Sequence, residues 1–238
     1  MRRFYAPAEN FDEEKISLSV EESKHLRDVL RLSEGASVSV FDGTGREFLC
    51  EIEKIEKKIS LLKIIKETEP TAPESNLDFT LAVALLKGEK FDLVVQKTVE
   101  LGVTRLVPLN TRRADVKLKD TEKRLERWQK IALEGCKQSG RAKLMQIESL
   151  VDFEKFIASV QGTRILFAER GGENFSKIKR TEKITAIVGS EGGWETAEIE
   201  SARENGFQTI TFGGRILRAE TAAIAVAAIL QNQFGDLV

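Results

Sequence analysis

Two glycine-rich turns are the places where this chain could hold a small ligand. In VGSEGGWETAEIE (188–200) an apolar run ends at Gly189, and Glu191 and two further glycines follow before a helix-like segment. Paired glycines permit positive φ angles and a close approach of the backbone to a ligand. Backbone N–H and C=O groups there can hold an adenine edge or a methionine carboxylate. A tight strand-to-helix turn that binds nothing has the same pattern, so both interpretations stay open for this segment alone.

The second turn repeats this arrangement nearer the C terminus. In ITFGGRILRAETAAIAVAAIL (210–230) a strand-like run is followed by Gly213 and Gly214, a short basic and apolar link, and a helix that is apolar on every face. Such a helix must be buried on both sides. Its small side chains suit either a tightly packed core or an interface between two subunits. The two turns together predict a pocket built largely from backbone beside a buried helix.

Several other kinds of site are disfavoured by the sequence. It contains no GxxxxGK[ST] phosphate loop, and GTGREF (43–48) lacks the third glycine of a dinucleotide motif. It contains no G-x-S-x-G elbow, and its only histidine, His25, is more typical of a structural or surface position than of catalysis. We therefore expect no nucleotide-driven, dinucleotide-dependent, triad-hydrolase or zinc chemistry, and no bound metal.

The elements that must position these turns fall into two regions, separated at ETEPTAPESN (67–76) by two prolines and small polar residues. A helix is predicted over 20–30, because Ser19 can cap it and Glu22 stands at the capping-box position. Strand-like alternation before the boundary occurs at 37–43, 47–57 and 58–65. We predict a small β-domain over residues 1–68 and a linker over 69–76.

After the boundary, strand-like and helix-like segments alternate, which predicts an α/β domain with a parallel sheet over residues 77–238. The strand-like segments lie at 79–86, 105–109, 164–169, 184–189 and 209–214. In open α/β sheets, ligands bind outside the carboxyl ends of the strands. A site is therefore expected at the turns 168–173, 189–193 and 213–218.

Composition indicates a globular protein of the reducing cytoplasm. The chain has 238 residues, of which 41% are hydrophobic and 32% are charged. Cys50 and Cys136 form neither a CxxC pair nor a disulfide framework. The apolar run 221–230 is too short to span a membrane, and the first residues lack the apolar core of a signal peptide. We expect a cytoplasmic location and no membrane partner.

The overall charge does not favour nucleic acid, but its local distribution does in one place. The net charge is −1, whereas duplex-binding domains usually carry a basic excess. From Arg105 to Lys143 there are twelve Lys or Arg against five Asp or Glu. Such a segment can attract phosphate, although a solvated amphipathic helix has the same composition. Residues 1–34 are less suited, with eight acids against six Lys or Arg.

At the level of motifs, VGSEGG together with FGGRILRAETA resembles the C-terminal signature of the SPOUT-type methyltransferases. Further segments resemble, in the same order, the RsmE branch, which methylates uridine N3 in 16S RNA of the small ribosomal subunit. These segments are MRRFY with HLRDVLRL (25–32), QKTVELGV (96–103), Arg113 after Pro108, and WQKIALEGCKQSGR (128–141). The resemblance covers nearly the whole chain.

The resemblance implies a fold and partners that the patterns above do not indicate. The implied fold is a small N-terminal PUA-like β-barrel that binds RNA, followed by a SPOUT α/β domain with a C-terminal trefoil knot. Knots are almost absent from proteins, so the alternation of elements alone predicts an ordinary open sheet. The implied partners are 16S rRNA or the assembled small subunit, and a second copy of the chain, since the family is homodimeric. The chain departs from the family pattern at Ser190, where the loop usually has proline, and at Arg112, where an acidic residue often stands.

The resemblance also implies roles for individual residues. The expected cofactor is S-adenosylmethionine, bound in a bent shape by Leu166, Phe167, Ala168, Gly189, Glu191, Gly192, Gly193, Phe212, Gly213, Ile216, Leu217, Arg218 and Ala219. The expected catalytic residues are Arg113, Arg141, Arg218 and Glu220. The expected RNA-binding residues are Arg2, Arg3, Lys24, His25, Arg27, Arg31, Arg113, Gln138 and Arg141.

Alternatives remain for both the residues and the function. Glu220, or else Glu191, is the candidate base or orienting carboxylate, but Glu220 also suits the first turn of a helix and could pair with Arg218. A non-catalytic RNA-binding or ribosome-assembly protein would share the basic segment and the glycine turns. A related transferase acting on tRNA would share the cofactor turns.

Overall fold

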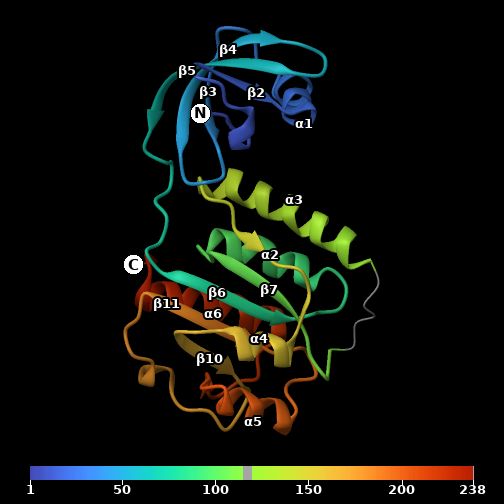
Figure 1. Ribbon diagram of the computed structural model, residues 1–238, viewed down its shortest axis with the longest axis vertical. Coiled ribbons are helices and arrows are strands. Elements are labelled where there is room, and N and C mark those ends of the chain that lie inside the picture. The colour runs from blue at the N-terminus through green and yellow to red at the C-terminus, as the bar shows by residue number, and fades with distance from the viewer. Residues whose placement is uncertain (115–119, 238) are drawn as a thin grey trace. The chain divides into compact units, whose positions relative to one another are not determined.

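The computed structural model describes residues 1–114 and 120–237, which fall into two compact units. The first unit comprises Met1–Glu74 together with Cys136–Leu144. The second comprises Ser75–Gly135 and the chain from Met145 to the C terminus. The two parts of the first unit can be found in Figure 1 by their colours. Met1–Glu74 is blue to teal, and Cys136–Leu144 is the short yellow-green segment that begins at the end of α3 (Thr121–Ser139).

The first unit is built on a five-stranded sheet in the order β1-β3-β4-β5-β2. β1 pairs with β3 in parallel, and the other neighbours are antiparallel. The predicted strands at 37–43, 47–57 and 58–65 are confirmed as β3, β4 and β5, whereas β1 and β2 carried no recognised signal. The strands span Arg3–Tyr5 (β1), Lys15–Leu18 (β2), Ser37–Phe41 (β3), Glu47–Ile55 (β4) and Ser60–Thr68 (β5).

The predicted helix is confirmed as α1 (Val20–Lys24), which continues as a π-helical turn, η2 (His25–Val29). The Ser19 hydroxyl accepts a hydrogen bond from the Glu22 backbone N–H at 3.2 Å, as an N-cap does. The Glu22 side chain pairs with Lys137 instead of closing a capping box. A 3₁₀ turn, η1 (Ala8–Asn10), precedes β2.

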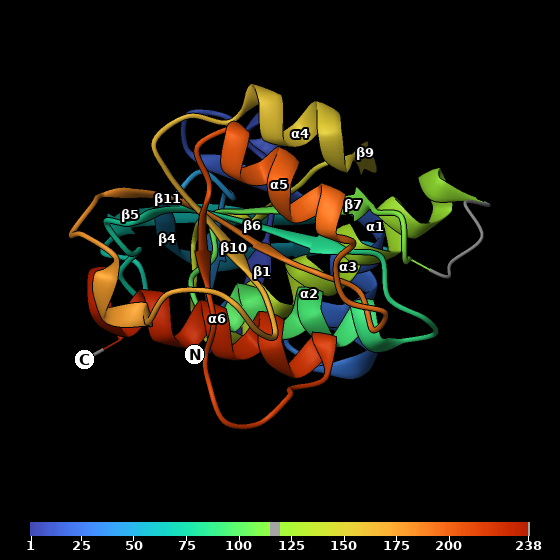
Figure 2. The ribbon, with the colours of Figure 1, turned by 90° about the horizontal axis from the view of Figure 1, so that it is seen from below.

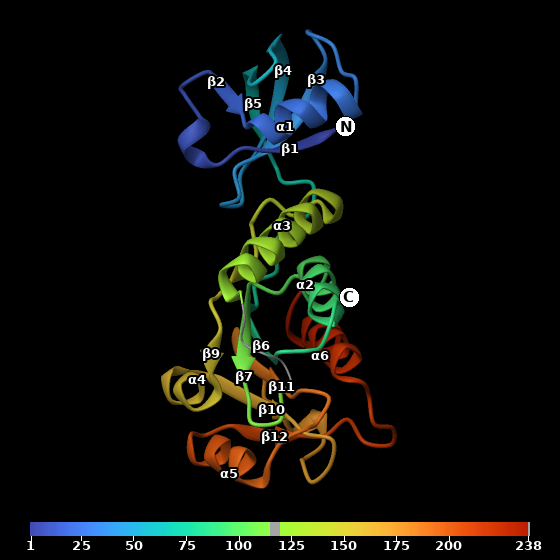
Figure 3. The ribbon, with the colours of Figure 1, turned by 90° about the vertical axis from the view of Figure 1, so that its right-hand side faces the viewer.

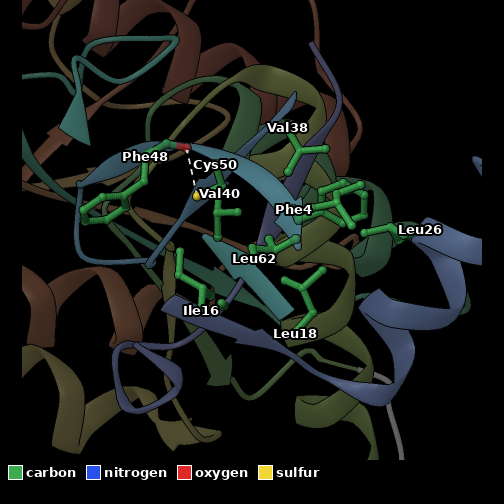
Figure 4. Close-up of a cluster of buried hydrophobic side chains, with 11 residues drawn as sticks. Phe4, Ile16, Leu18, Leu26, Val38, Val40, Phe48, Cys50 and Leu62 are labelled. Carbon is green, nitrogen blue, oxygen red and sulfur yellow. Dashed lines mark hydrogen bonds between the residues drawn. The ribbon is translucent and has the colours of Figure 1, made fainter. Parts of the chain in front are cut away.

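Alternating side chains from these strands form the core of the first unit (Figure 4). Phe4, Leu18 and Leu62 are among its fully buried members. Cys50 lies in this core, and burial raises the pKa of its thiol to about 12, which keeps it protonated and unreactive. Neither Cys50 nor Cys136 forms a disulfide.

A buried ion pair holds residues 136–144 in the first unit. Arg3 Nε lies 3.0 Å from Glu47 Oε1, and the same guanidinium donates to the carbonyl oxygens of Cys136 at 2.8 Å and Arg141 at 2.9 Å. Glu47 also accepts hydrogen bonds from the Ser39 hydroxyl and from Thr71 N–H. One arginine therefore joins strand β1, strand β4 and the end of α3.

The second unit contains a seven-stranded sheet in which every pairing is parallel, as the alternation of elements predicted. The order is β12-β10-β11-β6-β7-β8, with β9 also paired to β7. The strands span Asp78–Ala84 (β6), Arg105–Asn110 (β7), Gln146–Ile147 (β8), Val151–Asp152 (β9), Thr163–Phe167 (β10), Lys183–Val188 (β11) and Gln208–Ile210 (β12). The trefoil knot stays a prediction.

Helices cover both faces of this sheet (Figures 2 and 3). α2 (Lys90–Glu100) and α6 (Ala219–Phe234) pack against each other on one face. α4 (Phe153–Ser159) and α5 (Thr196–Glu204) lie on the other face, and η3 (Phe175–Lys177) is a single 3₁₀ turn after β10. Within residues 1–114 and 120–237, no helix is both long and apolar enough to cross a bilayer.

Replacing Glu47 with glutamine should destabilise the chain in a pH-dependent way. Burial would raise the pKa of Glu47 from its ordinary 4.5, but hydrogen bonds from Arg3, Ser39 and Thr71 N–H outweigh it and lower the pKa to about 2. The ionised carboxylate therefore stabilises the fold above pH 4.5, and this stabilisation is lost as the pH falls towards 2. From that shift, Glu47→Gln should cost on the order of 2–3 kcal/mol of unfolding free energy at pH 7, and the cost should shrink below pH 4.5.

Urea unfolding of both proteins between pH 7 and pH 3 would measure the difference in unfolding free energy. Hydrogen exchange of β3 and β4 would show whether the loss lies in these strands. Glu67→Gln is the matched control, because Glu67 pairs with Arg46 at the surface, where both side chains are more than half exposed. Its expected cost is below about 0.5 kcal/mol. Equal costs for the two substitutions at pH 7 would contradict the special role of Glu47.

Candidate functional site

The carboxyl ends of β10, β11 and β12 enclose a cavity of about 360 Å³ beside the first turn of α6. β10 lies between β11 and β12, so the segments that leave these three strands meet at one edge of the sheet. Its lining residues are Lys90, Phe167, Ala168, Glu169, Val188, Gly189, Ser190, Glu191, Gly193, Trp194, Phe212, Gly213, Arg215, Ile216, Leu217, Arg218, Ala219 and Ala222.

The turn after β11 is fixed by a buried tryptophan. The Trp194 indole Nε1–H donates to the Phe167 carbonyl oxygen at 2.9 Å, which joins this turn to the end of β10. A Cβ at Gly189 would lie 3.0 Å from the Trp194 ring, which is closer than an ordinary contact, so close approach favours glycine there. Gly193 has φ +68°, and its N–H donates to the Ser190 carbonyl oxygen at 3.0 Å. Glycine is therefore favoured at these two positions for different reasons, close approach to Trp194 at Gly189 and a positive φ at Gly193.

The segment after β10 is held against β12 in a similar way. The N–H of Glu173 donates to the Thr209 carbonyl oxygen, and the N–H of Thr211 donates to the Glu173 carbonyl oxygen. A Cβ at Gly172 would lie 2.6 Å from the Ile210 carbonyl carbon, which only glycine avoids. This pairing places Phe175 behind Phe212, and their rings stack with centroids 6.0 Å apart.

One wall of the cavity is aromatic and apolar. Phe212 also stacks on Phe167, with ring centroids 4.9 Å apart. Ile216 lies on the turn before α6, and its side chain is 60% exposed at the cavity. Such a surface can bind a flat apolar face, because burying an aromatic ring there removes apolar area from water.

Charged side chains line other parts of the cavity. Lys90 Nζ pairs with Glu191 Oε1 at 2.8 Å. Burial raises the pKa of Glu191, but hydrogen bonds from Lys90 and from the backbone N–H groups of Glu191 and Lys87 outweigh it, so that this pKa is lowered. Glu191 is therefore ionised at neutral pH, and a carboxylate of lowered pKa is a weak base. Glu169, Arg215 and Arg218 also face the cavity.

All the predicted cofactor residues line this cavity except Leu166 and Gly192. Leu166 is instead fully buried in a hydrophobic cluster with residues of α4 and α5. Gly192 lies against Arg113, where a Cβ would be 3.0 Å from the Arg113 Cβ. The role of the lining residues in binding stays a prediction.

Seven lining residues were not named among the expected cofactor residues: Lys90, Glu169, Val188, Ser190, Trp194, Arg215 and Ala222. Glu169, Ser190 and Arg215 nevertheless lie within the turns 168–173, 189–193 and 213–218, where the sequence predicts a site. Val188 and Trp194 directly flank the turn 189–193, so widening that turn by one position at each end would have included them, whereas Ala222 lies four positions beyond the turn 213–218. Lys90 is different, because it belongs to α2, about a hundred residues before Glu191 in the chain. Only the tertiary structure brings it to the cavity.

Arg113 does not line the cavity, but the loop after β7 that carries it is tied to the cavity turn. Its Nη1 donates to the Gly192 carbonyl oxygen at 3.2 Å, and the Ser190 hydroxyl donates to the Arg113 carbonyl oxygen at 3.0 Å. The Arg112 backbone N–H donates to Glu198 at 3.0 Å, and its side chain pairs with Glu195. Residues 115–119, part of the basic segment 105–143, lie outside the described residues.

Glu220 and Arg218 stand at the start of α6. Arg218 precedes the helix, is exposed and lines the cavity. Glu220 lies in the first turn, and its Oε2 is buried without a hydrogen-bond partner. The pairing with Arg218 that the sequence left open therefore does not satisfy this oxygen. An unpartnered buried carboxylate oxygen is unfavourable unless a donor reaches it.

The structure divides the predicted RNA-binding residues of the first unit into two groups. The exposed ones are Arg2, Lys24, His25, Arg31 and Gln138. Arg27 is half-buried and donates to the carbonyl oxygens of Glu56 and Lys57. His25 also lies edge-on to Phe4, with ring centroids 6.2 Å apart.

Arg3 and Arg141 differ from that expectation because their side chains are only 9% and 6% exposed. Arg3 pairs with Glu47 and Arg141 with Glu74, at 2.9 Å in the second case. Both guanidinium groups serve the fold of the first unit, and an RNA contact by either stays a prediction that requires its ion pair to open. The same applies to the predicted catalytic role of Arg141. Among the described residues, no group of three or more His, Cys, Asp or Glu side chains is arranged to hold a metal ion.

Comparisons with known proteins agree with both units. A family model described as an RNA methyltransferase domain matches residues 73–231, and one described as an RNA methyltransferase PUA domain matches residues 18–65. The solved structure of ribosomal RNA small subunit methyltransferase E from Neisseria gonorrhoeae, bound to S-adenosyl methionine, is 33% identical, with a TM-score of 0.93 over 100% of both chains. The predicted PUA-like domain followed by a parallel α/β domain is therefore confirmed.

Two further relatives carry the same name. The ribosomal RNA small subunit methyltransferase E of Synechocystis sp. is 33% identical over 236 residues, which are 95% of this chain and 76% of the relative. That of Bacillus subtilis is 31% identical over 231 residues, 91% of this chain and 90% of the relative.

Replacing Gly189 with alanine should destabilise the chain through Trp194. The added Cβ would press on the indole ring, which its hydrogen bond to Phe167 holds in place, and overpacking of this kind costs about 1–3 kcal/mol. In a Trp194→Phe background the indole atoms that clash are absent, so Gly189→Ala should cost at least 1 kcal/mol less there, as a double-mutant cycle measures. Urea unfolding of the four proteins gives these values. The same cost in both backgrounds would contradict the steric explanation.

Proposed function

The chain belongs to the RNA methyltransferase family that contains the ribosomal RNA small subunit methyltransferase E proteins, and from this membership we propose its substrate. The proposal is that it transfers the methyl group of S-adenosylmethionine to N3 of a uridine in the 16S RNA of the small ribosomal subunit. The observation that carries it is the cavity at the ends of β10, β11 and β12, in a chain similar over its full length to a transferase solved with that cofactor.

The cavity has the size and chemistry that this cofactor requires. Its volume of about 360 Å³ lies in the range of small-molecule sites, and its aromatic wall suits a purine. When bound, S-adenosylmethionine supplies an electrophilic methyl group on a sulfonium. Phe167, Ile216 and Leu217 would hold its adenosine part, and holding the reactants in line lowers the barrier by several kcal/mol.

Methylation at uridine N3 requires the loss of the N3 proton, which places negative charge on the base oxygens. A positive charge near these oxygens stabilises the transition state. Arg218 lines the cavity and is exposed, so its guanidinium can face O2 or O4 of the uracil as charge develops there. Arg113, fixed to the Gly192 carbonyl oxygen, stands beside the same turn and can bind RNA phosphate.

Glu220 suits an orienting role better than that of a base. Its Oε2 is buried and unpartnered, so it can accept a hydrogen bond from a neighbouring donor, but Glu220 is not among the residues that line the cavity. Glu191 is a poor base because its pKa is lowered. We therefore assign Glu220 to the orientation of the α6 start and leave the proton to solvent or to the RNA.

The outer face of α6 supports the proposal of a homodimer. One face of the helix is buried against α2 and the sheet through Ala223, Val226 and Leu230. The other face is also apolar and half-buried, with Ile224, Ala225 and Ile229. A second copy of the chain would cover this face, and because Ala222 lines the cavity the partner would lie close to the cofactor. The protein would work in the cytoplasm, where small ribosomal subunits are assembled.

Methyl transfer should be detected with labelled S-adenosylmethionine and small subunits that lack the modification. Mass spectrometry of the RNA should place one methyl group on a uridine N3. Alanine at Arg218 should lower the transfer rate about 100-fold or more while changing cofactor affinity less than 10-fold, because its guanidinium is assigned to the charge that develops on the base in the transition state. Alanine at Arg113 or Glu220 should also lower transfer more than cofactor affinity, because Arg113 is assigned to RNA phosphate and Glu220 to the orientation of the start of α6. Arg141→Ala tests the catalytic role that the resemblance implies for Arg141. A loss of stability in this variant would support a structural role for the ion pair between Arg141 and Glu74.

Arg203→Ala is the matched control, since Arg203 is an exposed arginine of α5 that donates to Thr209 and does not line the cavity. Methylation of tRNA in place of the small subunit would support a related transferase. RNA binding without cofactor binding would support an assembly protein. Unchanged transfer in all the arginine and glutamate variants would overturn the assignment of the site.

The homodimer is tested by the mass of the protein in solution. Ile229→Glu should convert a species of twice 26.6 kDa into one of 26.6 kDa, because a charge would be buried at the shared face. Multi-angle light scattering measures both masses. Gln233→Glu, near the exposed end of the same helix, should leave the mass unchanged. A wild-type protein of 26.6 kDa at micromolar concentration would contradict the dimer.

A further inference from the structure

An ion pair between distant parts of the second unit stands in the wall of the cavity. Lys90 is the first residue of α2, and Glu191 lies in the turn after β11. Lys90 Nζ and Glu191 Oε1 are 2.8 Å apart, and both side chains line the cavity. Of the described residues that line it, these are the two that form an ion pair with each other.

The Glu191 carboxylate is held by more than Lys90. The Lys87 backbone N–H approaches Glu191 Oε1 at 3.4 Å, and the N–H of Glu191 itself also stabilises the carboxylate. The carboxylate therefore has a fixed position and a full negative charge at neutral pH. A fixed charge of this kind suits the binding of a cation better than the transfer of a proton.

The pair is too exposed to be explained by stability. Lys90 is 38% exposed and Glu191 31% exposed, and pairs of that exposure contribute about 0–1 kcal/mol. Lys97 and Glu100 on the same helix form a pair with nearly the same exposure, 38% and 29%, at 2.9 Å, and do not line the cavity. A ligand that offers charges of both signs can replace or extend the Lys90–Glu191 contact at small cost.

S-adenosylmethionine has such an end. Its adenosine part is apolar and flat, and its amino-acid part carries an ammonium and a carboxylate on one carbon atom. The aromatic wall of Phe167 and Phe212 suits the first part, whereas the Lys90–Glu191 pair offers a cation and an anion for the second. Arg215 and Arg218 stand instead on the turn that carries Ile216 and Leu217.

We propose that Lys90 and Glu191 bind the amino-acid end of the cofactor. Lys90 binds the carboxylate of the cofactor, and Glu191 binds its ammonium. This inference rests on the proposed function, because it concerns the same cavity and cofactor. It assigns to Lys90, a residue of α2 outside all the glycine-rich turns, a direct contact with the cofactor. For Glu191, which the resemblance already places among the cofactor residues, it specifies the ammonium as the group that is bound.

Two ligands that differ only at this end test the proposal. S-adenosylhomocysteine carries the amino-acid end, and 5′-methylthioadenosine lacks it. Lys90→Met and Glu191→Gln should each weaken S-adenosylhomocysteine binding about 10-fold or more, as expected for a lost charge-assisted hydrogen bond, and change methylthioadenosine binding less than 2-fold. Titration calorimetry of the full chain measures all the affinities. Lys97→Met is the matched control and should change neither affinity.

Decarboxylated S-adenosylmethionine, which keeps the ammonium and lacks the carboxylate, separates the two contacts. Lys90→Met should leave its affinity within 2-fold of wild type, whereas Glu191→Gln should weaken it about 10-fold. Lys90→Arg should retain most of the preference for S-adenosylhomocysteine over methylthioadenosine, because it keeps the positive charge.

The outcomes distinguish this inference from the proposed function. If wild type binds none of the ligands, the proposed function fails, and the inference falls with it. If wild type binds both ligands but Lys90→Met and Glu191→Gln weaken them equally, the pair only shapes the cavity and the inference is overturned. Unchanged S-adenosylhomocysteine binding in both variants overturns it as well.

Discussion

The position of β10 between β11 and β12 is the constraint on which the site depends. Because all three strands run parallel, their carboxyl ends lie at one edge, and the segments that leave them must pass within a few ångströms of one another. Gly172 and Gly189 permit this crowding, since a Cβ at either would press on Ile210 or on Trp194. The Trp194 hydrogen bond to the Phe167 carbonyl oxygen then joins two of the strand ends. The positions of the cavity walls are therefore set largely by the strand order of the sheet.

The two positions at which the resemblance leads us to expect other residues, Ser190 and Arg112, act at the same place. Proline would stiffen the cavity turn by fixing its own φ, and Ser190 achieves a comparable restraint by donating to the Arg113 carbonyl oxygen. Arg112, where the resemblance leads us to expect an acid, pairs with Glu195 at the start of α5, and its backbone N–H donates to Glu198. Both substitutions therefore connect the loop after β7 to the turn after β11. That connection links the basic segment that begins at Arg105 to the cofactor cavity through hydrogen bonds of the second unit alone.

The first unit depends on a buried ion pair between Arg3 and Glu47. Its small sheet leaves Arg3 and Glu47 inside, where each must find several partners to offset the loss of water. Those partners include the carbonyl oxygens of Cys136 and Arg141, so the end of α3 becomes part of the PUA-like unit although it follows the linker by sixty residues. The same arrangement places Arg141 against Glu74. An arginine that looks suited to RNA in the sequence is thereby used for folding.

The sequence by itself determined the local structure and the family. Alternation of polar and apolar residues predicted β3 to β5 and the parallel sheet, because side-chain periodicity reflects which faces are buried. The glycine-rich turns predicted most of the cavity lining, because the residues that line the cavity lie in the segments that directly follow the same strands. The tertiary structure alone decided which distant residues meet. Lys90 reaches Glu191, and Arg3 reaches Cys136, through packing between elements separated by about a hundred residues, which no local pattern encodes. Exposure was decided there too, because a charged side chain in a sequence gives no sign of whether an opposite charge will bury it.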